Sequence, residues 1–132
     1  MYHVLRHHAG GHHSAELSAA VSRSKAKGTH WESAIIHYLN EFGFDCERRA
    51  PSGALDRGDI SGVRGFIIEA KNCKGITLST WIDEAEAERI NDDVPYGVVW
   101  AHRTGRSSPG DGYVVMSGRI FVDILKGMGY LD

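Results

Sequence analysis

The chain has 132 residues, of which 42% are hydrophobic and 24% charged, and its formal net charge is −2 at pH 7. This length suits a single domain with a real core, and the composition excludes a disordered or fibrous protein. No segment reaches the roughly 18 consecutive apolar residues of a membrane-spanning helix, and the first residues lack the apolar core of a secretory signal, so we expect a cytoplasmic protein without a membrane partner.

The N-terminal residues 1–22 are predicted to form a flexible tail rich in histidine, and residues 23–132 a single domain. Nothing near the tail histidines would orient their rings, so a flexible extension or a purification handle is favoured over a metal site. The histidines concerned are His7, His8, His12 and His13. In the basic arm that follows, Arg23, Lys25 and Lys27 could contact phosphates or simply be solvated.

A helix is predicted from about Thr29 to Phe42, because apolar side chains recur there at three- and four-residue intervals and Gly43 follows as a stop. Apolar and alternating runs later in the chain predict five strands and two more helices. The strands are expected at 44–50, 59–62, 65–71, 96–103 and 112–117, and the helices at 78–91 and 119–129. This αβββαββα order predicts an α/β domain with a mixed central sheet of about five strands, flanked by helices.

The helix at 78–91 overlaps an acidic run, in which residues 82–93 hold six acids and one Arg. By contrast, residues 21–81 hold nine Lys or Arg and seven Asp or Glu. The acidic run is interpreted as a solvated helix face, although a segregated field is also compatible with a phosphate-binding face elsewhere. The buried stripe of this helix is expected to consist of Leu78, Trp81, Ile82 and Ala85.

The strand at 65–71 carries Glu69 and Lys71 on the same face, since side chains two residues apart in a strand share a face. A three-residue loop at 63–65 would place Asp59 opposite Glu69 on that face, with the glycine of the loop free to be left-handed. A two-residue loop would send Asp59 to the opposite face. Asp56 would need an added bulge to reach Glu69, so Asp59 is preferred and Asp56 remains the alternative.

Two adjacent carboxylates repel each other unless a cation lies between them, and their oxygens suit Mg²⁺ or Mn²⁺. In such a site the metal acidifies a water and neutralises a phosphodiester, while Lys71 orients that water or stabilises developing charge. Glu32 lies in the first turn of the first predicted helix, where it could cap the helix or reach the metal cluster directly or through water. An E-x-K tripeptide alone is a weak signal, and its context of strand, hairpin partner and helix is what gives it specificity.

Residues 27–72, "KGTHWESAIIHYLNEFGFDCERRAPSGALDRGDISGVRGFIIEAKN", resemble the PD-(D/E)XK nuclease superfamily. Within it they look most like the archaeal-type Holliday-junction resolvases and related bacteriophage nucleases. Those enzymes share an acid on the first helix, an R-x-x-SG stretch, an Asp on a short strand and E-x-K on the next. The matching positions here are Glu32, Arg49 with Ser52 and Gly53, Asp59, Glu69 and Lys71; Gly58 stands where the superfamily has Pro.

The resemblance implies a restriction-endonuclease-like fold and a metal-dependent endonuclease. The expected activity is the resolution of Holliday junctions or other branched DNA in recombination or replication, by a homodimer, in the host cytoplasm if the protein is phage-encoded. Asp59, Glu69 and Glu32 are expected to bind one or two Mg²⁺ ions, for which Mn²⁺ would substitute, and Lys71 completes the catalytic set. The alternatives are a flap, single-strand or restriction-type nuclease, or a DNA-binding module that does not cleave.

Several basic and polar residues around this set are candidate DNA contacts. The alternative for each basic residue is a solvated surface charge, which is the norm for exposed Arg and Lys, and the alternative for Ser52 is a turn cap. The preferred ones are Arg49, Ser52, Arg57, Lys74, Lys25 and Lys27. Further candidates on the loops are Arg48, Arg64, Arg103 and Arg106.

Overall fold

The structure, a computed structural model, describes residues 2–49 and 59–131, and the side chains from Glu16 onward apart from those of residues 17, 21 and 24. Its elements are α1 (Tyr2–Glu41), β1 (Glu47–Arg48), β2 (Ile60–Ser61), β3 (Phe66–Lys71), α2 (Leu78–Asn91), β4 (Tyr96–Ala101), η1 (Pro109–Asp111), β5 (Tyr113–Val115) and α3 (Gly118–Gly127). The predicted order of helices and strands is therefore confirmed, with one additional short 3₁₀ turn.

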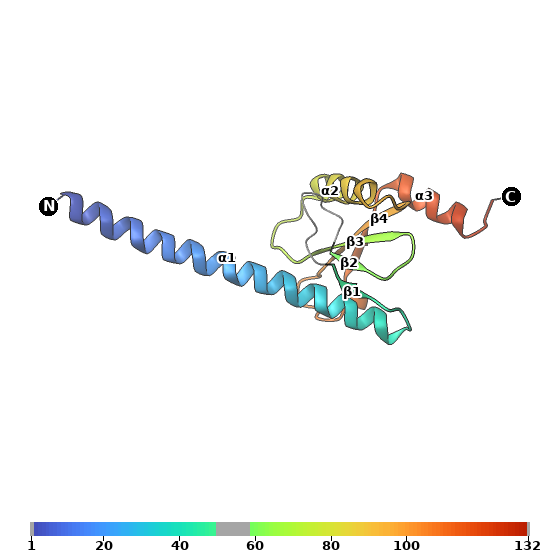
Figure 1. The fold of residues 1–132 in the computed structure, drawn as a ribbon, viewed down its shortest axis with the longest axis horizontal. Coiled ribbons are helices and arrows are strands. Elements are labelled where there is room, and N and C mark those ends of the chain that lie inside the picture. Colours follow the sequence, from blue (N-terminus) through green and yellow to red (C-terminus); the bar gives the residue numbers. More distant parts are fainter. Residues whose placement is uncertain (1, 50–58, 132) are drawn as a thin grey trace.

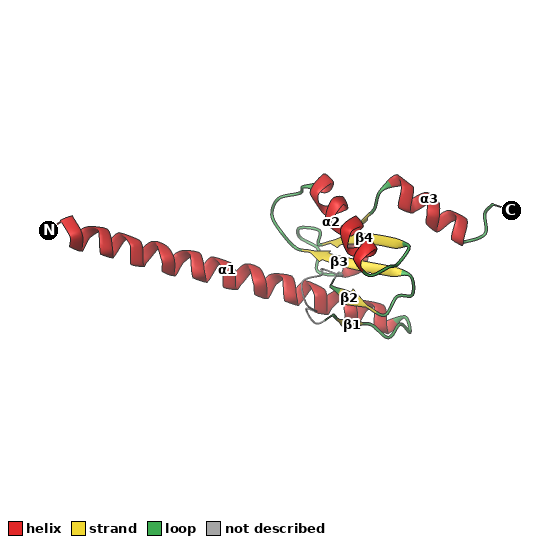
Figure 2. Cartoon of the chain, turned by 45° about the horizontal axis from the view of Figure 1, so that its top comes forward, coloured by secondary structure: helices red, strands yellow, loops and turns green. Residues whose placement is uncertain are grey.

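The five strands form one mixed sheet in the order β1-β2-β3-β4-β5. Neighbouring strands are antiparallel except β3 and β4, which run parallel. A parallel pair needs a crossover connection, and α2 provides it between β3 and β4. Helix α2 covers one face of the sheet and the C-terminal part of α1 covers the other (Figures 1 and 2). The α/β class with a mixed sheet of five strands, predicted from the sequence, is confirmed.

Two apolar clusters form the core, one on each face of the sheet. On the α1 side, Trp31 and Ile35 pack against Ile60, Ile68 and Val98. On the α2 side, Ile67 and Val99 pack against the Trp81 and Ala85 side chains of the helix; Ala101 completes this second cluster. Because side chains alternate along β3, its central apolar run serves both clusters, as expected of a strand covered on both faces.

Helix α1 begins far earlier than predicted. It starts at Tyr2 rather than near Thr29, so the backbone of residues 2–28 is helical instead of an irregular tail. Once a helix is nucleated by the packed segment around Trp31 and Ile35, each further residue adds a hydrogen bond, and the Ala, Lys and Glu residues upstream are good helix formers. The first part of α1 projects away from the sheet (Figure 1).

Helix α2 has the predicted bounds but a different buried stripe. Its buried residues are Trp81, Ala85 and Glu88, whereas Leu78 is 50% exposed. The spacing of four and three residues puts Glu88 on the face that packs on the sheet. The interpretation of the whole acidic run as a solvated face is therefore wrong at Glu88, which is only 2% exposed.

Among the described residues, the structure contains no helix with both the length and the apolar character needed to span a membrane.

Candidate functional site

The hairpin of β2 and β3 has the predicted register. Ile60 pairs with Ile68 in this antiparallel hairpin, so Asp59 and Glu69 are the next facing pair along the two strands. The connecting turn closes with the Phe66 amide donating to the Val63 carbonyl at 3.1 Å. Gly65 in this turn has φ of 85°, a left-handed conformation that favours glycine. The three-residue loop expected from the sequence is thus present, and it brings the two acids together.

Asp59 turns its carboxylate toward the backbone of β3 rather than straight out from a face of the sheet. Its Oδ2 accepts a hydrogen bond from the Ala70 amide at 2.9 Å, and its own amide donates to the Ile68 carbonyl at 3.1 Å. These contacts lie where the regular pairing of β2 with β3 stops. A charged acceptor held by a backbone amide is fixed in orientation, so the Asp59 carboxylate is a positioned group and not a freely moving surface acid.

Glu69 is a buried acid whose pKa is strongly perturbed. Its side chain is only 12% exposed and hydrogen-bonds to the carboxyl group of the buried Glu88 on α2. Burial, followed by repulsion from Asp59 and Glu88, raises the pKa of Glu69 to about 10. Its Oε2 is buried and has no hydrogen-bond partner within the described part of the chain. In this state the Glu69 carboxyl carries a proton at neutral pH.

Lys71 lies two residues further along β3 on the face shared with Glu69. Its Nζ is 2.6 Å from Glu84 Oε2 on α2 and 3.7 Å from Glu69 Oε1. Burial favours the neutral amine, but the hydrogen bond to Glu84 and the charges of Glu69 and Glu84 outweigh it and raise the pKa of Lys71. The side chain is therefore an ammonium held beside the acids, which suits electrostatic stabilisation and not proton abstraction.

Glu32 approaches from the other side of the sheet, because it lies on α1. Its Oε2 accepts a hydrogen bond from Arg48 Nε at 2.8 Å, and the same arginine binds the Thr29 carbonyl and the Ser33 hydroxyl. Burial and then repulsion from Asp59 raise the pKa of Glu32. Glu32 is thus close enough to Asp59 for their charges to interact, while its present partner is Arg48.

The acids of this site suit a divalent cation in chemistry. A buried, unpartnered oxygen on Glu69 and the mutual repulsion of Glu69 and Asp59 are features that a hard cation would relieve. On the other hand, no group of three or more His, Cys, Asp or Glu side chains is gathered in metal-binding geometry within residues 16–49 and 59–131. Asp56, the alternative ligand, lies outside the described residues. The described donor set therefore amounts to a pair of carboxylates, Asp59 and Glu69, with Glu32 nearby.

The predicted DNA contacts separate into different groups. Arg49 is held in a two-pronged ion pair with Asp92, at 2.8 Å for each prong, so its guanidinium already has an acidic partner. Lys25 is exposed on α1, and Lys27 and Lys74 line a groove beside the site. Ser52 and Arg57 lie outside the described residues.

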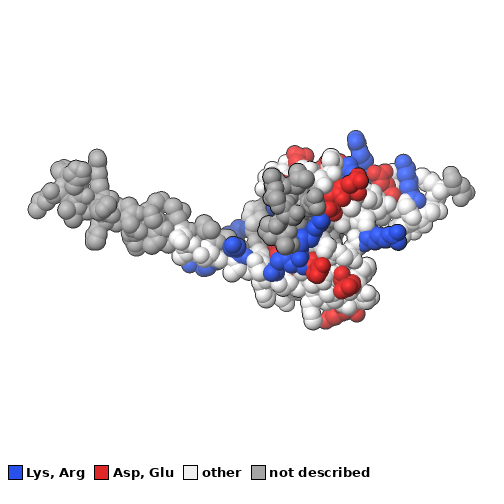
Figure 3. All heavy atoms as spheres, in the orientation of Figure 1, with Lys and Arg blue, Asp and Glu red and all other residues white. Residues whose placement is uncertain are grey.

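This groove runs between α1 and the end of β3 and has a volume of about 680 Å³. We call it the basic groove; it is lined by Ala20, Arg23, Lys27, Ala70, Lys71, Asn72, Cys73 and Lys74. Four of these eight residues are basic and none is acidic. Figure 3 shows basic side chains where α1 meets the body of the domain, with many of the acidic ones over α2. Arg23 and Lys27 are one helical turn apart, which places both on the side of α1 that faces the groove.

Two residues of this site, Glu84 and Glu88, were missed in the sequence. Glu88 follows Trp81 and Ala85 at the spacing of a helix face, so the periodicity could have identified it had the acidic run not been treated as one solvated surface. The spacing of Glu84 offers no comparable signal. Arg23 was predicted only as part of a basic arm ahead of the helix, and its place on α1 is what brings it to the groove.

Comparison with known proteins found no family model, no curated protein and no solved structure that matches this chain.

Proposed function

We propose that this protein is a metal-dependent endonuclease that hydrolyses DNA phosphodiesters. The observation that carries the proposal is the β2–β3 register, which sets Asp59 beside Glu69 with the Lys71 ammonium on the same strand. A basic groove containing Lys71 adjoins these residues and offers a path for a phosphate backbone. Two crowded carboxylates, a lysine and a basic groove together suit phosphoryl hydrolysis better than any other chemistry among the described residues.

Each residue has a role in this proposal. Asp59 and Glu69 would hold Mg²⁺, or Mn²⁺ in its place, and Glu32 would complete the set from α1. A bound divalent ion supplies charge neutralisation of the phosphodiester and a more acidic water. The Ala70 amide keeps the Asp59 carboxylate oriented, and Glu84 holds the Lys71 ammonium near Glu69 Oε1, where it can stabilise negative charge on a phosphate.

The finer proposal is that the substrate is branched DNA, such as a Holliday junction formed in recombination or replication, cut by a homodimer in the cytoplasm. It rests on the sequence resemblance to the PD-(D/E)XK superfamily and its restriction-endonuclease-like fold, with which the mixed sheet and flanking helices are compatible. Flap, single-strand and restriction-type nucleases share the chemistry and differ only in the DNA that reaches the site.

A second candidate is a DNA-binding module that does not cleave. It is favoured by the finding that the described residues gather no set of three metal-binding side chains, and by the engagement of Glu32 with Arg48. This module would retain the basic groove and bind DNA with the same salt dependence.

The test is incubation of the full chain with a labelled four-way junction, a flap, duplex and single-stranded DNA, in Mg²⁺, Mn²⁺ or EDTA. Glu69→Gln keeps the size of the side chain and is expected to abolish cleavage. The matched control, Glu41→Gln, changes a side chain on α1 that is 61% exposed and is expected to cut like the parent. Cleavage in EDTA, or a Glu69→Gln protein as active as the parent, would refute the metal-dependent mechanism. Binding without cleavage would establish the second candidate, and equal cutting of duplex and junction would remove the branched-DNA specificity.

A further inference from the structure

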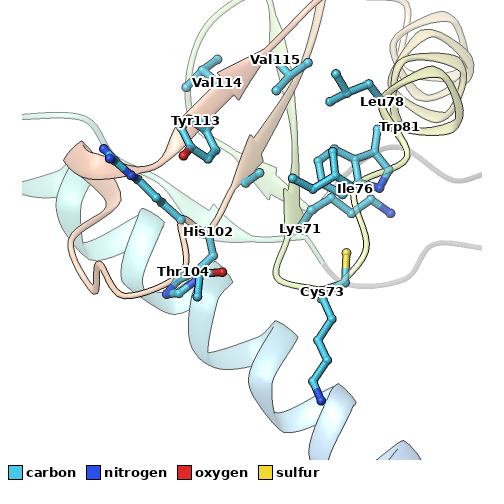
Figure 4. Close-up of a pocket in the computed structure, with 13 residues that line it drawn as sticks. Lys71, Cys73, Ile76, Leu78, Trp81, His102, Thr104, Tyr113, Val114 and Val115 are labelled. Carbon is cyan, nitrogen blue, oxygen red and sulfur yellow. The ribbon is translucent and has the colours of Figure 1, made fainter.

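A second pocket, of about 560 Å³, opens on the α2 side of the sheet beyond the ends of β3 and β4. Figure 4 shows side chains of β5 and of the start of α2 on opposite sides of it, with Ile76 and Lys71 between them. Its apolar lining is unusually exposed: Ile76 is 69%, Leu78 50% and Tyr113 48% accessible. Several exposed apolar side chains that line one concavity indicate a binding site, whereas single exposed apolar side chains are ordinary on a protein surface.

The same pocket has a basic rim. Lys71, Lys74, His102 and Arg103 line it, and no acidic side chain is among its described lining residues. The Arg103 guanidinium lies over the Tyr113 ring, 5.8 Å from its centroid, which joins the cationic rim to an aromatic surface. A ligand that suits this lining has a flat apolar part and a negative charge. An unpaired nucleotide has both, since its base stacks on aromatic rings and its phosphate pairs with Lys and Arg.

Lys71, Cys73 and Lys74 line both this pocket and the basic groove. The two concavities therefore meet at the end of β3, beside the pair of Glu69 and Lys71. A strand whose phosphates follow the basic groove would reach the pocket just after passing Lys71. The apolar walls there would accept a base only if that base were unpaired, because a base within a duplex is stacked and hydrogen-bonded to its partner.

We propose that this pocket binds one unpaired nucleotide of a single-stranded DNA segment, with its base on Tyr113 and its phosphate near Lys71 and Lys74. This inference rests on the proposed nuclease function, from which it takes DNA as the ligand. It adds a preference to that function, because the pocket would select DNA with unpaired nucleotides at an end, a flap or a branch point over continuous duplex. The binding itself does not require cleavage.

The test is fluorescence anisotropy in EDTA with a labelled thymidine oligonucleotide of about ten residues, within the range of single-strand site sizes. An abasic chain of the same length and charge is the comparison. The full-length protein is expected to bind the thymidine chain at least about tenfold more tightly than the abasic chain. Tyr113→Ala should remove most of this difference, and Ile76→Ser, on an exposed loop residue, should reduce it. The control Tyr130→Ala changes an equally large side chain, 70% exposed and outside the pocket, and should retain it.

Equal affinity for the thymidine and abasic chains would overturn the inference. It would also be overturned if Tyr113→Ala and Ile76→Ser altered the sedimentation of the protein but not its preference for bases, because the patch would then be a contact between two copies of the chain. A protein that shows the base preference in EDTA but never cleaves DNA in Mg²⁺ or Mn²⁺ would retain this inference and refute the proposed nuclease.

Discussion

Replacing Glu69 with Gln should change the pH dependence of stability, independently of any activity. In the folded protein the pKa of Glu69 is about 10, against 4.5 as its ordinary value. Unfolding therefore releases a proton from this carboxyl between those two pH values, and the folded state loses stability as pH rises through that window. The slope for one such group is ~1.4 kcal/mol per pH unit, so between pH 6 and pH 8 the free energy of unfolding should fall by about 2.7 kcal/mol more than in a chain lacking the group.

The assay is urea unfolding of the parent, Glu69→Gln and Glu41→Gln in EDTA at pH 6, 7 and 8. The titrating groups other than the hydrogen-bonded pair of Glu69 and Glu88 are shared, so the difference between the slopes isolates that pair. The parent and Glu41→Gln should lose stability together between pH 6 and pH 8, whereas Glu69→Gln should lose about 2.7 kcal/mol less. Mg²⁺ or Mn²⁺ at pH 8 should stabilise the parent but not Glu69→Gln. Parallel pH profiles for all three proteins would refute the burial and charge crowding assigned to Glu69.

Three further predictions concern the lysine, the groove and the fold. Lys71→Met should slow DNA cleavage about 10²- to 10³-fold and change the affinity for an oligonucleotide in EDTA far less, because the ammonium acts chiefly on the negative charge that develops on the phosphate during cleavage. Equal losses of cleavage rate and of affinity would contradict that role. Charge reversal at Arg23 and Lys27 should weaken DNA binding, measured by fluorescence anisotropy at several salt concentrations. The slope of the logarithm of the binding constant against the logarithm of the salt concentration should become less steep by about one for each phosphate that the variant no longer neutralises. An unchanged slope would show that DNA does not follow the basic groove. Gly62→Ala should lower the free energy of urea unfolding by more than about 2 kcal/mol, because φ is 113° and the added Cβ would clash with the Asp45 carbonyl oxygen. The control Gly129→Ala, at φ 83° with open space around it, should lower it by about 1 kcal/mol. Equal losses would show that the backbone around Gly62 moves to accommodate the Cβ.

The register of the hairpin could be predicted because two local signals agreed. The alternation of β3 fixed which side chains share a face, and a glycine in the loop suited the left-handed turn that a three-residue connection needs. The same reasoning did not foresee how Asp59 is oriented. Its carboxylate turns to the Ala70 amide because β2 is only two residues long, and the length at which backbone pairing stops is set by the whole sheet rather than by the hairpin sequence.

The extent of α1 could not be read from the residues before Thr29. Their apolar side chains show no strong helical stripe, and the described side chains between residues 16 and 27 are all exposed, so burial does not require one there. Hydrophobic periodicity reports burial, so it detects the buried part of α1 around Trp31 and gives no signal where the described side chains of residues 16–27 are exposed. The consequence for function is direct, because Arg23 and Lys27 face the groove only as part of this helix.

The acids of α2 explain how a buried strand tolerates Glu69 and Lys71 side by side. Glu84 lies near the mouth of the site and neutralises Lys71 at 2.6 Å, while Glu88, one turn deeper, shares a proton with Glu69. The helix thus offers one carboxyl that contacts Lys71 and one that is hydrogen-bonded to Glu69, which are successive residues of one strand face. A cation beside Glu69 and Asp59 would take the place of the proton in that hydrogen bond, so in the metal-free form α2 supplies a hydrogen-bond partner for the buried Glu69 carboxyl. The variant Glu88→Gln tests this arrangement. It should preserve the fold, because the amide can still donate a hydrogen bond to Glu69, and it should lower the pKa of Glu69, because the repulsion from Glu88 is lost. An infrared titration of the carboxyl stretch in EDTA would measure that pKa. An unchanged titration would show that Glu88 has no part in setting the charge of Glu69.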